Sequence, residues 1–479
     1  MSGAPEPGRT VGSIRIGNGA GFWGDNLDAP IRLAEKGALD FLTLEYLAEL
    51  TLSILAHQRR LDPDAGFVGD FPATIARLIP ILKAQPRLRI VTNAGGLNPQ
   101  ACARATAKLL ADAGMGGEKI AWVSGDDLIP RMGELRMAGE GFRHFDSGEE
   151  PQTAFVSANA YLGARPIADA LNRGARIVIT GRVADASLTV GPAMHTFQWS
   201  WSDWEKLAVA SAAGHLIECG AQVTGGLVSR WKTVPDYATI GYPIAILTRD
   251  GQCRITKPVG TGGIVNRETV TGQLLYEIGD PRRYHTPDVT LDFTDMEVEE
   301  ETGNVVRVMG AKGFQPPNTL KVSCAYENGF SAKGDLTVCG HDAAEKARVC
   351  GEIILERVRL AGFSLSRRNV ELVGTGASMD NAVPDGLHEV VLRISIWDRD
   401  KKAVERFCRE FSPIITSGPP GVTGYTGSRP RARPVLSYWP TTVSRDRVPA
   451  RVEVREAVEL AAMPGAGPDS KTGMKAGRT

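Results

Sequence analysis

Short β-branched runs that end in glycine, asparagine, serine or aspartate recur along the first half of the chain. The pattern appears at residues 14–25 (IRIGNGAGFWGD), 90–98 (IVTNAGGLN), 120–127 (IAWVSGDD), 155–163 (FVSANAYLG) and 177–185 (IVITGRVAD). A stretch with helical character follows each run, and strands that alternate with helices predict a mostly parallel sheet. Because such sheets bind ligands outside the carboxyl ends of their strands, we expect these five loops to converge on one site.

Apolar residues at intervals of three and four predict the helices between these strands. Residues 71–83, for example, place Ile75, Leu78 and Leu82 at helical spacing before the strand at 88–92. Pro30 suits the first turn of another helix, because its missing amide hydrogen costs nothing there. The pattern predicts helices at residues 30–35, 71–83, 100–113 and 207–219, and a further strand at residues 40–44.

The alternation of strands and helices ends after residue 239, where strand-like segments follow one another without a helix between each pair. This favours an α+β domain with a mixed or antiparallel sheet. The segments are residues 244–248, 289–293, 305–309, 319–325, 335–338 and 390–396, with helices expected at 343–359 and 403–411. The glycine- and proline-rich residues 416–434 are expected to lack regular structure.

The chain is long enough for two domains, and we predict four segments from these patterns. The predicted segments are a disordered N-terminus at residues 1–12, an α/β ligand-binding domain at 13–229, an α+β domain at 230–460 and a disordered tail at 461–479.

Composition narrows the class of partner. The 55 basic and 55 acidic residues cancel, so no global charge attracts nucleic acid or an anionic membrane, and we expect a small-molecule substrate. No apolar run reaches the roughly 20 residues of a membrane span, and no secretory signal begins the chain, which predicts a cytoplasmic protein. The seven cysteines are scattered without a C-x-x-C pair, so reduced thiols are expected.

Carboxylates gather where the predicted strands end. If the sheet is parallel, these acids share one edge, where paired carboxyl groups could act as general acid and base or hold Mg²⁺. The acids are Asp25, Glu45, Asp126, Asp127 and Asp185, with Asp126 the first choice of general base. Each acid taken alone also fits a helix N-cap, and Asp185 fits that role best.

A second titratable group lies on a predicted helix. His215, Glu218 and Cys219 fall at i, i+3 and i+4 and therefore share one helical face. His215 could serve as a base or as one of a pair of metal ligands, although one histidine and one cysteine are too few for zinc. A polar helix face against a neighbouring domain explains the same spacing.

Glycines and amides near the strand ends are candidate ligand contacts. Backbone amides at Gly19, Gly21, Gly95 and Gly96 could cradle a phosphate or carboxylate, beside the side chains of Asn18, Asn93 and Asn159. A glycine turn that serves packing explains these glycines equally well. Neither a dinucleotide fingerprint nor a P-loop is present, and no G-x-S-x-G motif is found.

Two basic residues are candidate anion contacts. Arg182 in TGRVAD follows a strand, where it could bind an anion in a bidentate manner or pair with Asp185. Lys257 precedes Gly262 and Gly263 in KPVGTGG, a loop that could reach an anion such as a CoA phosphate or form a simple hairpin.

These loops and several other blocks resemble the acyclic terpene utilisation AtuA family over residues 14–454. The additional blocks are LDFLTLEYLAELTLSILA, SANAYLGARPIADAL, AGHLIECGAQVTGG and QLLYEIGDP. The resemblance implies a cytoplasmic protein of acyclic terpene and branched-acid catabolism, in pathways that use CoA thioesters, carboxylation and hydration. Some members carry or accompany a small ferredoxin-like domain after this part. The chain ends too soon after Val454 to include one, so a small partner subunit is a candidate.

The resemblance supplies no catalytic residue, and the site residues above come from the sequence pattern alone. We predict a homo-oligomeric enzyme with hydratase- or lyase-type acid/base chemistry on an acyl-CoA or carboxylate. The alternative is a non-catalytic subunit of a carboxylase or hydratase complex, which would present residues 416–434 and Trp199, Trp201 and Trp204 as its contact surface.

Overall fold

The computed structural model describes residues 12–377 and 386–465. The chain forms two compact units, of which the first comprises Met1–Cys324 and Tyr438–Thr479 and the second Ala325–Ser437. The boundary expected at residues 229/230 falls inside the first unit, because β7 (Ile244–Thr248) pairs antiparallel with β1 (Ser13–Asn18) and extends the same sheet. Most of the two terminal segments predicted to be disordered lies outside the described residues.

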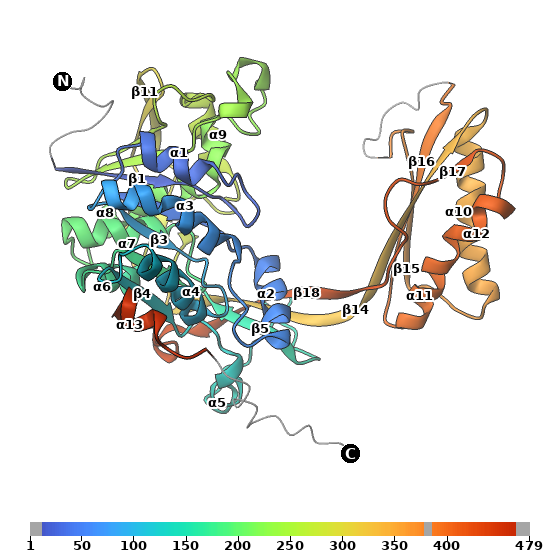
Figure 1. The fold of residues 1–479 in the computed structure, drawn as a ribbon, viewed down its shortest axis with the longest axis horizontal. Helices are drawn as coiled ribbons and strands as arrows, with labels where there is room; N and C mark the ends of the chain where they lie inside the picture. The colour runs from blue at the N-terminus through green and yellow to red at the C-terminus, as the bar shows by residue number, and fades with distance from the viewer. Residues whose placement is uncertain (1–11, 378–385, 466–479) are drawn as a thin grey trace. The chain divides into compact units, whose positions relative to one another are not determined.

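A ten-stranded mixed sheet forms the centre of the first unit (Figure 1). Five central strands are parallel, in the order β1, β2 (Phe41–Leu44), β3 (Arg89–Thr92), β6 (Ile177–Thr180) and β4 (Lys119–Ser124). Antiparallel strands extend both sides: β7, β8 (Cys253–Thr256), β12 (Val305–Met309) and β11 (Glu297–Thr302) beside β1, and β19 (Arg451–Glu456) beside β4. The predicted α/β class with a mostly parallel central sheet is confirmed.

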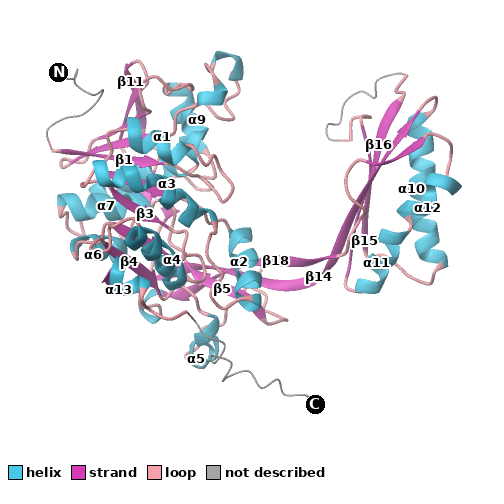
Figure 2. Ribbon diagram, in the orientation of Figure 1, coloured by secondary structure: helices cyan, strands magenta, loops and turns pink. Residues whose placement is uncertain are grey.

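Helices cover both faces of this sheet (Figure 2). One row contains α1 (Ala29–Lys36), α3 (Asp70–Ala84), α4 (Pro99–Asp112) and α13 (Ala457–Ala461), and the other α6 (Arg165–Asn172), α7 (Ser187–Phe197) and α8 (Trp204–Glu218). Strands covered on both faces bury consecutive side chains, as Ile90, Val91 and Thr92 show. This explains why these strands read as continuous apolar runs rather than as alternating patterns.

The two rows create a switch point at the carboxyl edge of the sheet. After β3 the chain enters α4 in one row, and after β6 it enters α7 in the other row. Because β3 and β6 are neighbours, the loops that follow them leave the sheet in opposite directions. Open α/β sheets bind their ligands at such points, so the fold directs attention to this edge.

One predicted strand of the parallel sheet lies elsewhere. β5 (Phe155–Ala160) pairs with β14 (Thr319–Cys339), because β6 occupies the position between β3 and β4. Isolated bridges from Asp127 to Asn159 and from Leu162 to Val183 nevertheless keep the β5 segment beside the strand ends. The loop after β5 therefore reaches the expected edge although its strand belongs to another pairing.

The second unit has a βαββαβ order. It contains the end of β14, α10 (Ala343–Leu360), β15 (Arg367–Val373), β16 (Glu389–Asp398), α11 (Lys401–Arg409), α12 (Phe411–Ser417) and β17 (Val422–Tyr425). Its antiparallel sheet has the order β15-β16-β14-β17, which is the arrangement of two split βαβ units known as ferredoxin-like. The predicted α+β character of the second half is confirmed.

Two details of the second half differ from expectation. The predicted strands at 319–325 and 335–338 are parts of the single strand β14. Residues 416–434, expected to be irregular, contain the short strand β17, which pairs with β14 at an edge where glycine and a short length are tolerated.

The remaining elements complete the two units. They are α2 (Glu49–Leu61), α5 (Met132–Met137), α9 (Arg267–Leu275), β18 (Arg433–Ser444) and a three-stranded sheet of β9 (Tyr284–His285), β10 (Thr290–Asp292) and β13 (Lys312–Phe314). All seven cysteines are free, as predicted. Among the described residues no helix combines the length and apolarity needed to cross a membrane.

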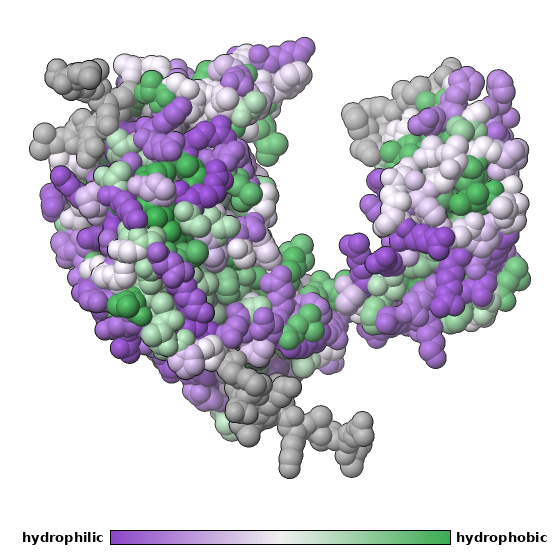
Figure 3. All heavy atoms as spheres, viewed as in Figure 1, coloured by the Kyte–Doolittle hydropathy of each residue, from purple (hydrophilic) through white to green (hydrophobic). Residues whose placement is uncertain are grey.

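The face of the first unit that Figure 3 shows does not by itself indicate where a ligand binds. Hydrophilic side chains cover most of that face, and apolar areas are scattered between them. Such a distribution is ordinary for folded proteins, and buried polar groups are the more informative feature of this unit.

Candidate functional site

A small hollow lies at the carboxyl ends of β1 and β2, where helices α7 and α8 approach the sheet. The space between its atoms is about 170 Å³ with open solvent included, and no water-sized molecule fits within it. Its lining consists of Asn18, Thr43, Glu45, Asp185, Leu188, Thr189, Gly214, Ile217 and Glu218. Complete small-molecule sites usually measure about 300–1,000 Å³. A ligand would therefore enter only if the side chains that line the hollow moved apart.

Glu45 follows β2 directly and is almost completely buried, with 4% of its surface exposed. Its Oε1 accepts hydrogen bonds from the Leu47 amide at 3.0 Å and from Asn93 Nδ2, whereas Oε2 has no partner among the described residues. Burial raises the pKa of Glu45 well above its usual range, and Asp185 raises it further against the effect of Arg182. Glu45 thus keeps its proton to higher pH than an ordinary glutamate, and it has one free oxygen at the hollow.

Arg182 follows β6, and its guanidinium is buried and bonded through Nη1, whereas Nε has no hydrogen-bond partner among the described residues. Nη1 donates to the Leu47 carbonyl oxygen at 2.6 Å and lies 3.0 Å from Asp185 Oδ1 and 3.7 Å from Glu45 Oε1. The guanidinium carbon also lies 4.0 Å from the ring centroid of Tyr161. The predicted pairing with Asp185 is therefore present, and Arg182 is absent from the lining of the hollow.

Asp185 is the most accessible acid of the hollow, with 35% of its side chain exposed. Burial raises the pKa of Asp185, and Glu49 adds to the effect, while Arg182 opposes both. The residue does not act as the N-cap of α7, because the cap position is Ala186 and no side-chain hydrogen bond caps that helix. This leaves the Asp185 carboxyl available to a ligand.

Glu218 and His215 lie one turn apart near the end of α8, as their spacing predicts. That end is set by Gly220, whose φ of +57° turns the chain out of the helix. His215 Nδ1 is 3.4 Å from Glu218 Oε1, and the imidazole packs 5.8 Å from the ring of Tyr284. His215 is 1% exposed, and neither of its ring nitrogens has a hydrogen-bond partner among the described residues. The imidazole is therefore held beside the carboxyl by packing and charge.

The pKa values of this pair favour proton exchange near neutrality. Burial raises the pKa of Glu218 to about 7, although His215 partly offsets the effect. Burial alone would lower the pKa of His215, but the Glu218 carboxylate more than compensates and raises it. Burial also raises the pKa of Cys219 to about 12, so its thiol stays protonated and is a poor nucleophile.

Asp126, the first choice of general base from the sequence, does not line the hollow. It is 2% exposed, and its Oδ2 accepts hydrogen bonds from the Arg182 amide and from Asn159 Nδ2, each at 2.8 Å. Burial raises its pKa to about 7. A Cβ on Gly181 would lie 2.4 Å from Asp126 Oδ1, which requires glycine there. Asp126 therefore holds the loop that positions Arg182 and Asp185.

Two further predicted acids serve the structure. Asp127 Oδ2 pairs with Arg59 at 2.8 Å, and its Oδ1 accepts from the Ile129 amide at 3.1 Å. Asp25 Oδ1 accepts from the Tyr242 hydroxyl at 2.5 Å, and its Oδ2 accepts from the Gly21 amide at 2.8 Å. Neither acid lines the hollow.

The amides of the β1 loop are occupied by the protein itself. Gly19 donates to the Thr43 carbonyl oxygen at 2.9 Å, and Gly21 donates to Asp25. A Cβ on Gly21 would lie 2.8 Å from the backbone of Cys219, so this glycine serves a close approach of the loop to α8. Asn18 donates to the carbonyl oxygens of Ile217 and Glu218, each at 2.8 Å, and so fixes the end of that helix.

The loop after β3 has a similar structural role. Asn93 connects it to Glu45, and its Oδ1 accepts from the Tyr46 amide at 2.9 Å. A Cβ on Gly95 would lie 2.5 Å from the Thr180 carbonyl oxygen, and Gly96 has a φ of +52°. Packing and turn geometry therefore account for both glycines.

The polar groups of the KPVGTGG loop form hydrogen bonds within the protein. Lys257 is 7% exposed, and its Nζ donates to the Thr261 carbonyl oxygen at 2.7 Å. Burial lowers the pKa of Lys257. Gly262 and Gly263 donate their amides to the carbonyl oxygens of Thr239 and Pro235. None of these three residues lines the hollow.

Some residues that line the hollow were difficult to recognise from the sequence. Glu218 was visible only through its helical spacing from His215, and Thr43 and Thr189 lie inside elements that read as core. Gly214 gave a usable signal, because an isolated glycine within a helix often marks close packing. A Cβ there would lie 2.7 Å from the Cα of Ala186, so α8 contacts the start of α7 at this point.

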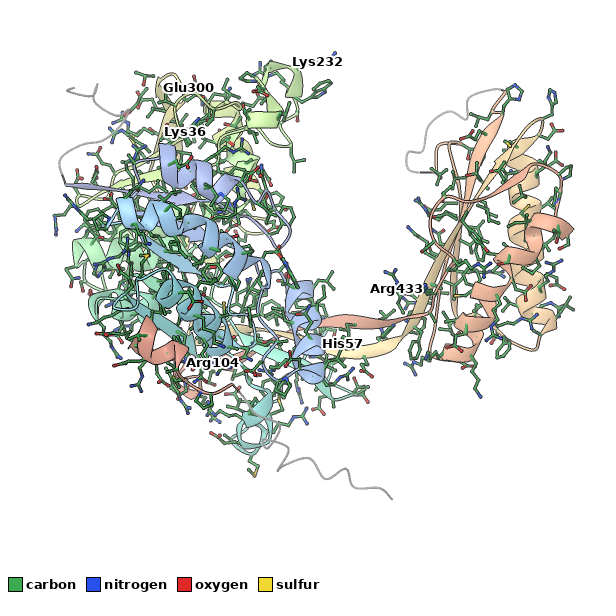
Figure 4. All side chains as sticks on the ribbon, in the orientation of Figure 1. Lys36, His57, Arg104, Lys232, Glu300 and Arg433 are labelled. Atoms are coloured by element: carbon green, nitrogen blue, oxygen red, sulfur yellow. The ribbon has the colours of Figure 1, made fainter. Side chains whose placement is uncertain are left out.

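Other predicted groups lie apart from the hollow. His57 is exposed on α2, where Figure 4 labels it. In residues 12–377 and 386–465, no three His, Cys, Asp or Glu side chains form a group that could hold a metal ion. The Mg²⁺ site that the sequence allows at the paired acids stays a hypothesis.

If Asp126 is a positioning residue, its substitution has specific expected results. Asp126→Asn should keep turnover within about tenfold and change the free energy of unfolding by about 1 kcal/mol or less, because one amide oxygen can accept both hydrogen bonds. Asp126→Ala should cost about 1–3 kcal/mol, since it leaves the Arg182 amide and Asn159 unpaired. Urea unfolding and turnover of both variants check this. A loss of turnover above about a hundredfold in a folded Asn variant would restore Asp126 as the base.

Comparisons with known proteins place the chain in a family. The family described as acyclic terpene utilisation family protein AtuA matches residues 14–454, nearly the whole chain. Neither the curated proteins nor the solved structures contain a match. The match covers both compact units and the whole lining of the hollow. The chain therefore belongs to the acyclic terpene utilisation AtuA family.

Proposed function

We propose that this protein is an enzyme that uses acid/base chemistry of the hydratase or lyase type on an acyl-CoA or carboxylate. Membership of the AtuA family suggests involvement in acyclic terpene utilisation. The proposal places this chemistry in catabolism of acyclic terpenoids or branched acids. Its chief support is the hollow lined by Glu45, Asp185 and Glu218.

Glu218 has the properties of a general base. An efficient base has a pKa near the working pH, and burial brings the pKa of Glu218 to about 7. His215 lies beside it and stabilises the ionised form, so the carboxylate is present in a large fraction of molecules at neutral pH. Glu218 replaces Asp126 as our choice of base, because Asp126 does not line the hollow.

Glu45 has the complementary properties of a general acid. Burial raises its pKa well above the ordinary range, so it keeps its proton to higher pH than an ordinary glutamate. Carboxyl groups whose environments separate their pKa values divide into an acid and a base. In a dehydration, Glu218 would take the proton next to the carbonyl while Glu45 protonates the departing hydroxyl, which leaves as water.

Addition of water would run through the same groups in reverse. After either direction one carboxyl group has gained a proton and the other has lost one, so the cycle closes when a proton passes from the first group to the second. Asp185 could relay that proton through solvent, because it lines the hollow and is 35% exposed.

Arg182 has a supporting role in this proposal. Its guanidinium pairs with Asp185 and lies near Glu45, so it limits the mutual repulsion of the two carboxyl groups. The sequence suggested that Arg182 and Lys257 hold an anionic part of the substrate. We do not retain that role, because each cation bonds a carbonyl oxygen of the protein and neither lines the hollow.

The alternative of a non-catalytic subunit receives less support from the tryptophan cluster. Trp199 is 8% exposed and its indole donates to the Arg249 carbonyl oxygen at 2.9 Å. Trp201 packs against Arg165, whose guanidinium carbon is 4.6 Å from the ring centroid. Both side chains therefore have partners inside the first unit.

Thermal unfolding with a ligand panel tests the proposed function. The panel contains branched acyl-CoAs, the matching free acids and nucleotides, each with and without Mg²⁺. A ligand at a hundred times its dissociation constant adds about 2.7 kcal/mol to native stability, which should raise the midpoint by several degrees. We expect this shift with a branched acyl compound and no shift with nucleotides. Stabilisation by nucleotides alone, or no response to any acyl compound, would contradict the proposal.

A further inference from the structure

We propose that strand β15 pairs antiparallel with β15 of a second copy of this chain, around a two-fold axis at Asn369, and so joins the sheets of two second units edge to edge. Three features carry this inference: the open edge of β15, the protection of other outer strands, and an order of charges that matches itself. Dimerisation through this edge does not depend on the proposed function.

β15 is an outer strand with an open edge. Among the described residues it pairs with β16 alone, in seven consecutive pairs from Arg367↔Trp397 to Val373↔Val391. Helices α10, α11 and α12 lie on one face of this sheet (Figure 2), and residues 367–370 of the strand are exposed. One side of β15 therefore presents backbone amide and carbonyl groups to which another strand can bind.

β15 lacks the usual structural protections of an edge strand. Native edges are commonly very short, interrupted by proline or a bulge, or covered by another element. β15 has seven residues, its sequence RRNVELV contains neither proline nor glycine, and its pairing with β16 shows no register shift. Its charged residues are of both signs, so they can attract a strand with the matching order of charges.

Other outer strands of the described chain are protected. β11 carries four glutamates, which would repel a second copy. In β19, the carbonyl oxygen of Val452 already accepts a hydrogen bond from Arg173 at the end of α6, at 3.1 Å. The outer strands β9, β13 and β17 have only two, three and four residues. β15 is therefore the outer strand best suited to pair with another chain.

The charges of β15 are complementary to themselves in one register. In a two-fold interface, residue i contacts residue j of the second copy, and j contacts i. An axis at Asn369 puts Arg367 opposite Glu371 of the second copy and Glu371 opposite the second Arg367. The two side chains share one face of the sheet, because they are four residues apart in a strand. The dimer thus gains the same cross-strand ion pair twice.

Both side chains are available for this contact. Neither forms an ion pair within the described residues. Arg367 lies over the ring of Trp397, with its guanidinium carbon 5.2 Å from the centroid, which orients it on that face. The residue opposite Glu371 in β16 is Arg393, which pairs with Asp335 at 3.0 Å instead.

Neighbouring registers are less favourable. An axis at Arg368 would put two arginines opposite each other, and an axis at Glu371 would do the same with two glutamates. Like charges in directly opposite positions destabilise a strand pair. An axis at Val370 would put Arg367 opposite Val373 and leave its charge without a direct partner. The order of charges therefore favours the axis at Asn369.

Sedimentation velocity of the full chain between about 1 and 100 µM tests the association. We expect a monomer–dimer equilibrium in this range, because one strand pair buries less than the roughly 1,200–2,000 Å² of a standard interface. Arg367→Glu and Glu371→Arg each put like charges opposite each other at two positions, so each should weaken dimerisation about 10- to 100-fold. Lys402→Glu, exposed in the first turn of α11, makes an equal change of charge as the control and should have no effect.

Combining the substitutions separates strand pairing from a general effect of charge. The double variant Arg367→Glu/Glu371→Arg restores both ion pairs in reverse, so it should dimerise within about threefold of the wild type. An equimolar mixture of the two single variants should form heterodimers, because one chain then carries two acids and the other two bases at the paired positions.

A cysteine at the axis tests the register. Opposite Cα atoms of antiparallel strands are about 4.5–5.5 Å apart, within reach of a disulfide. Asn369→Cys should therefore crosslink two chains on mild oxidation, as seen by non-reducing electrophoresis. Val373→Cys lies in the same strand away from the axis and should not crosslink beyond the wild type.

Thermal unfolding midpoints within about 2 °C of the wild type establish that the variants are folded. A wild-type chain that stays monomeric throughout, or an association that neither single substitution weakens, would overturn the proposal. So would a folded Asn369→Cys that does not crosslink, or a crosslink through Val370→Cys in its place. None of these measurements uses turnover or an acyl ligand, so their failure leaves the proposed function standing, and failure of the ligand panel leaves the dimer standing.

Discussion

Replacing Glu218 by glutamine is expected to lower kcat by a factor of about 10²–10⁴, the usual contribution of a general acid or base. Glutamine retains the size and hydrogen-bonding capacity of the side chain but cannot take a proton. The buried position should tolerate this change, because burial already disfavours the charged carboxylate. Turnover of the branched acyl ligand identified by the unfolding panel is the measurement.

The pH profile gives this prediction a second readout. If Glu218 acts as a base in its ionised form, kcat/KM should rise with pH through about 7, the pKa of its carboxyl, and that limb should vanish in the variant. Glu205→Gln is the matched control, because Glu205 lies in the first turn of the same helix and is exposed. Full activity of Glu218→Gln, or loss of activity in both variants, would remove Glu218 from the role of base.

Replacing Arg182 by methionine is expected to destabilise the protein by about 3–5 kcal/mol, the usual cost of removing one partner of a buried ion pair. Methionine roughly preserves the apolar contact with Tyr161 but leaves Glu45 and Asp185 without their cation. The Leu47 carbonyl oxygen also loses its hydrogen bond from Nη1. Arg182→Lys retains the charge without the planar donor arrangement and should fall between the wild type and Arg182→Met.

The loss in Arg182→Met should grow with pH, and the sign follows from Glu45 and Asp185. Both have pKa values raised above their ordinary values of 4.5 and 3.8 in the folded protein, and loss of Arg182 raises them further. A raised pKa contributes stability that is present below the unfolded value and is lost as pH rises through the folded value. Urea unfolding at pH 5 and pH 8 measures the difference. Equal destabilisation at both values, or a larger loss at pH 5, would contradict this account.

The central strands of the first unit could be predicted from the sequence because a buried strand appears there as a short run of apolar residues. β1, β2, β3, β4 and β6 are short apolar runs that end in small or polar residues, and the fold covers them with helices on both faces. Their order could not be predicted in the same way. Nothing local to the segment at 155–160 reveals that β6 lies between β3 and β4 and leaves β5 to pair with β14.

The extent of the domains was likewise hidden from local patterns. The change of sequence pattern after residue 239 corresponds to a change in strand pairing, because the strands that follow are paired antiparallel. Five of them (β7, β8, β11, β12 and β19) nevertheless extend the ten-stranded sheet of the first unit, and only residues 325–437 form the second. Strand pairing between the two halves of the chain sets this boundary. The hydrophobic periodicity of single segments does not reveal which strands pair.

The sequence by itself determined the kinds of residue that would gather at one edge of a parallel sheet. Glu45 and Asp185 follow buried strands, and the spacing of His215 and Glu218 puts them on one face of a helix. Only the tertiary structure decided which of these groups are free. Asp126, Asp127 and the glycine amides meet partners from distant segments, while Glu45, Asp185 and Glu218 line a common hollow. Hydrogen-bond satisfaction depends on distances between segments far apart in the chain, so it exists only in the folded molecule.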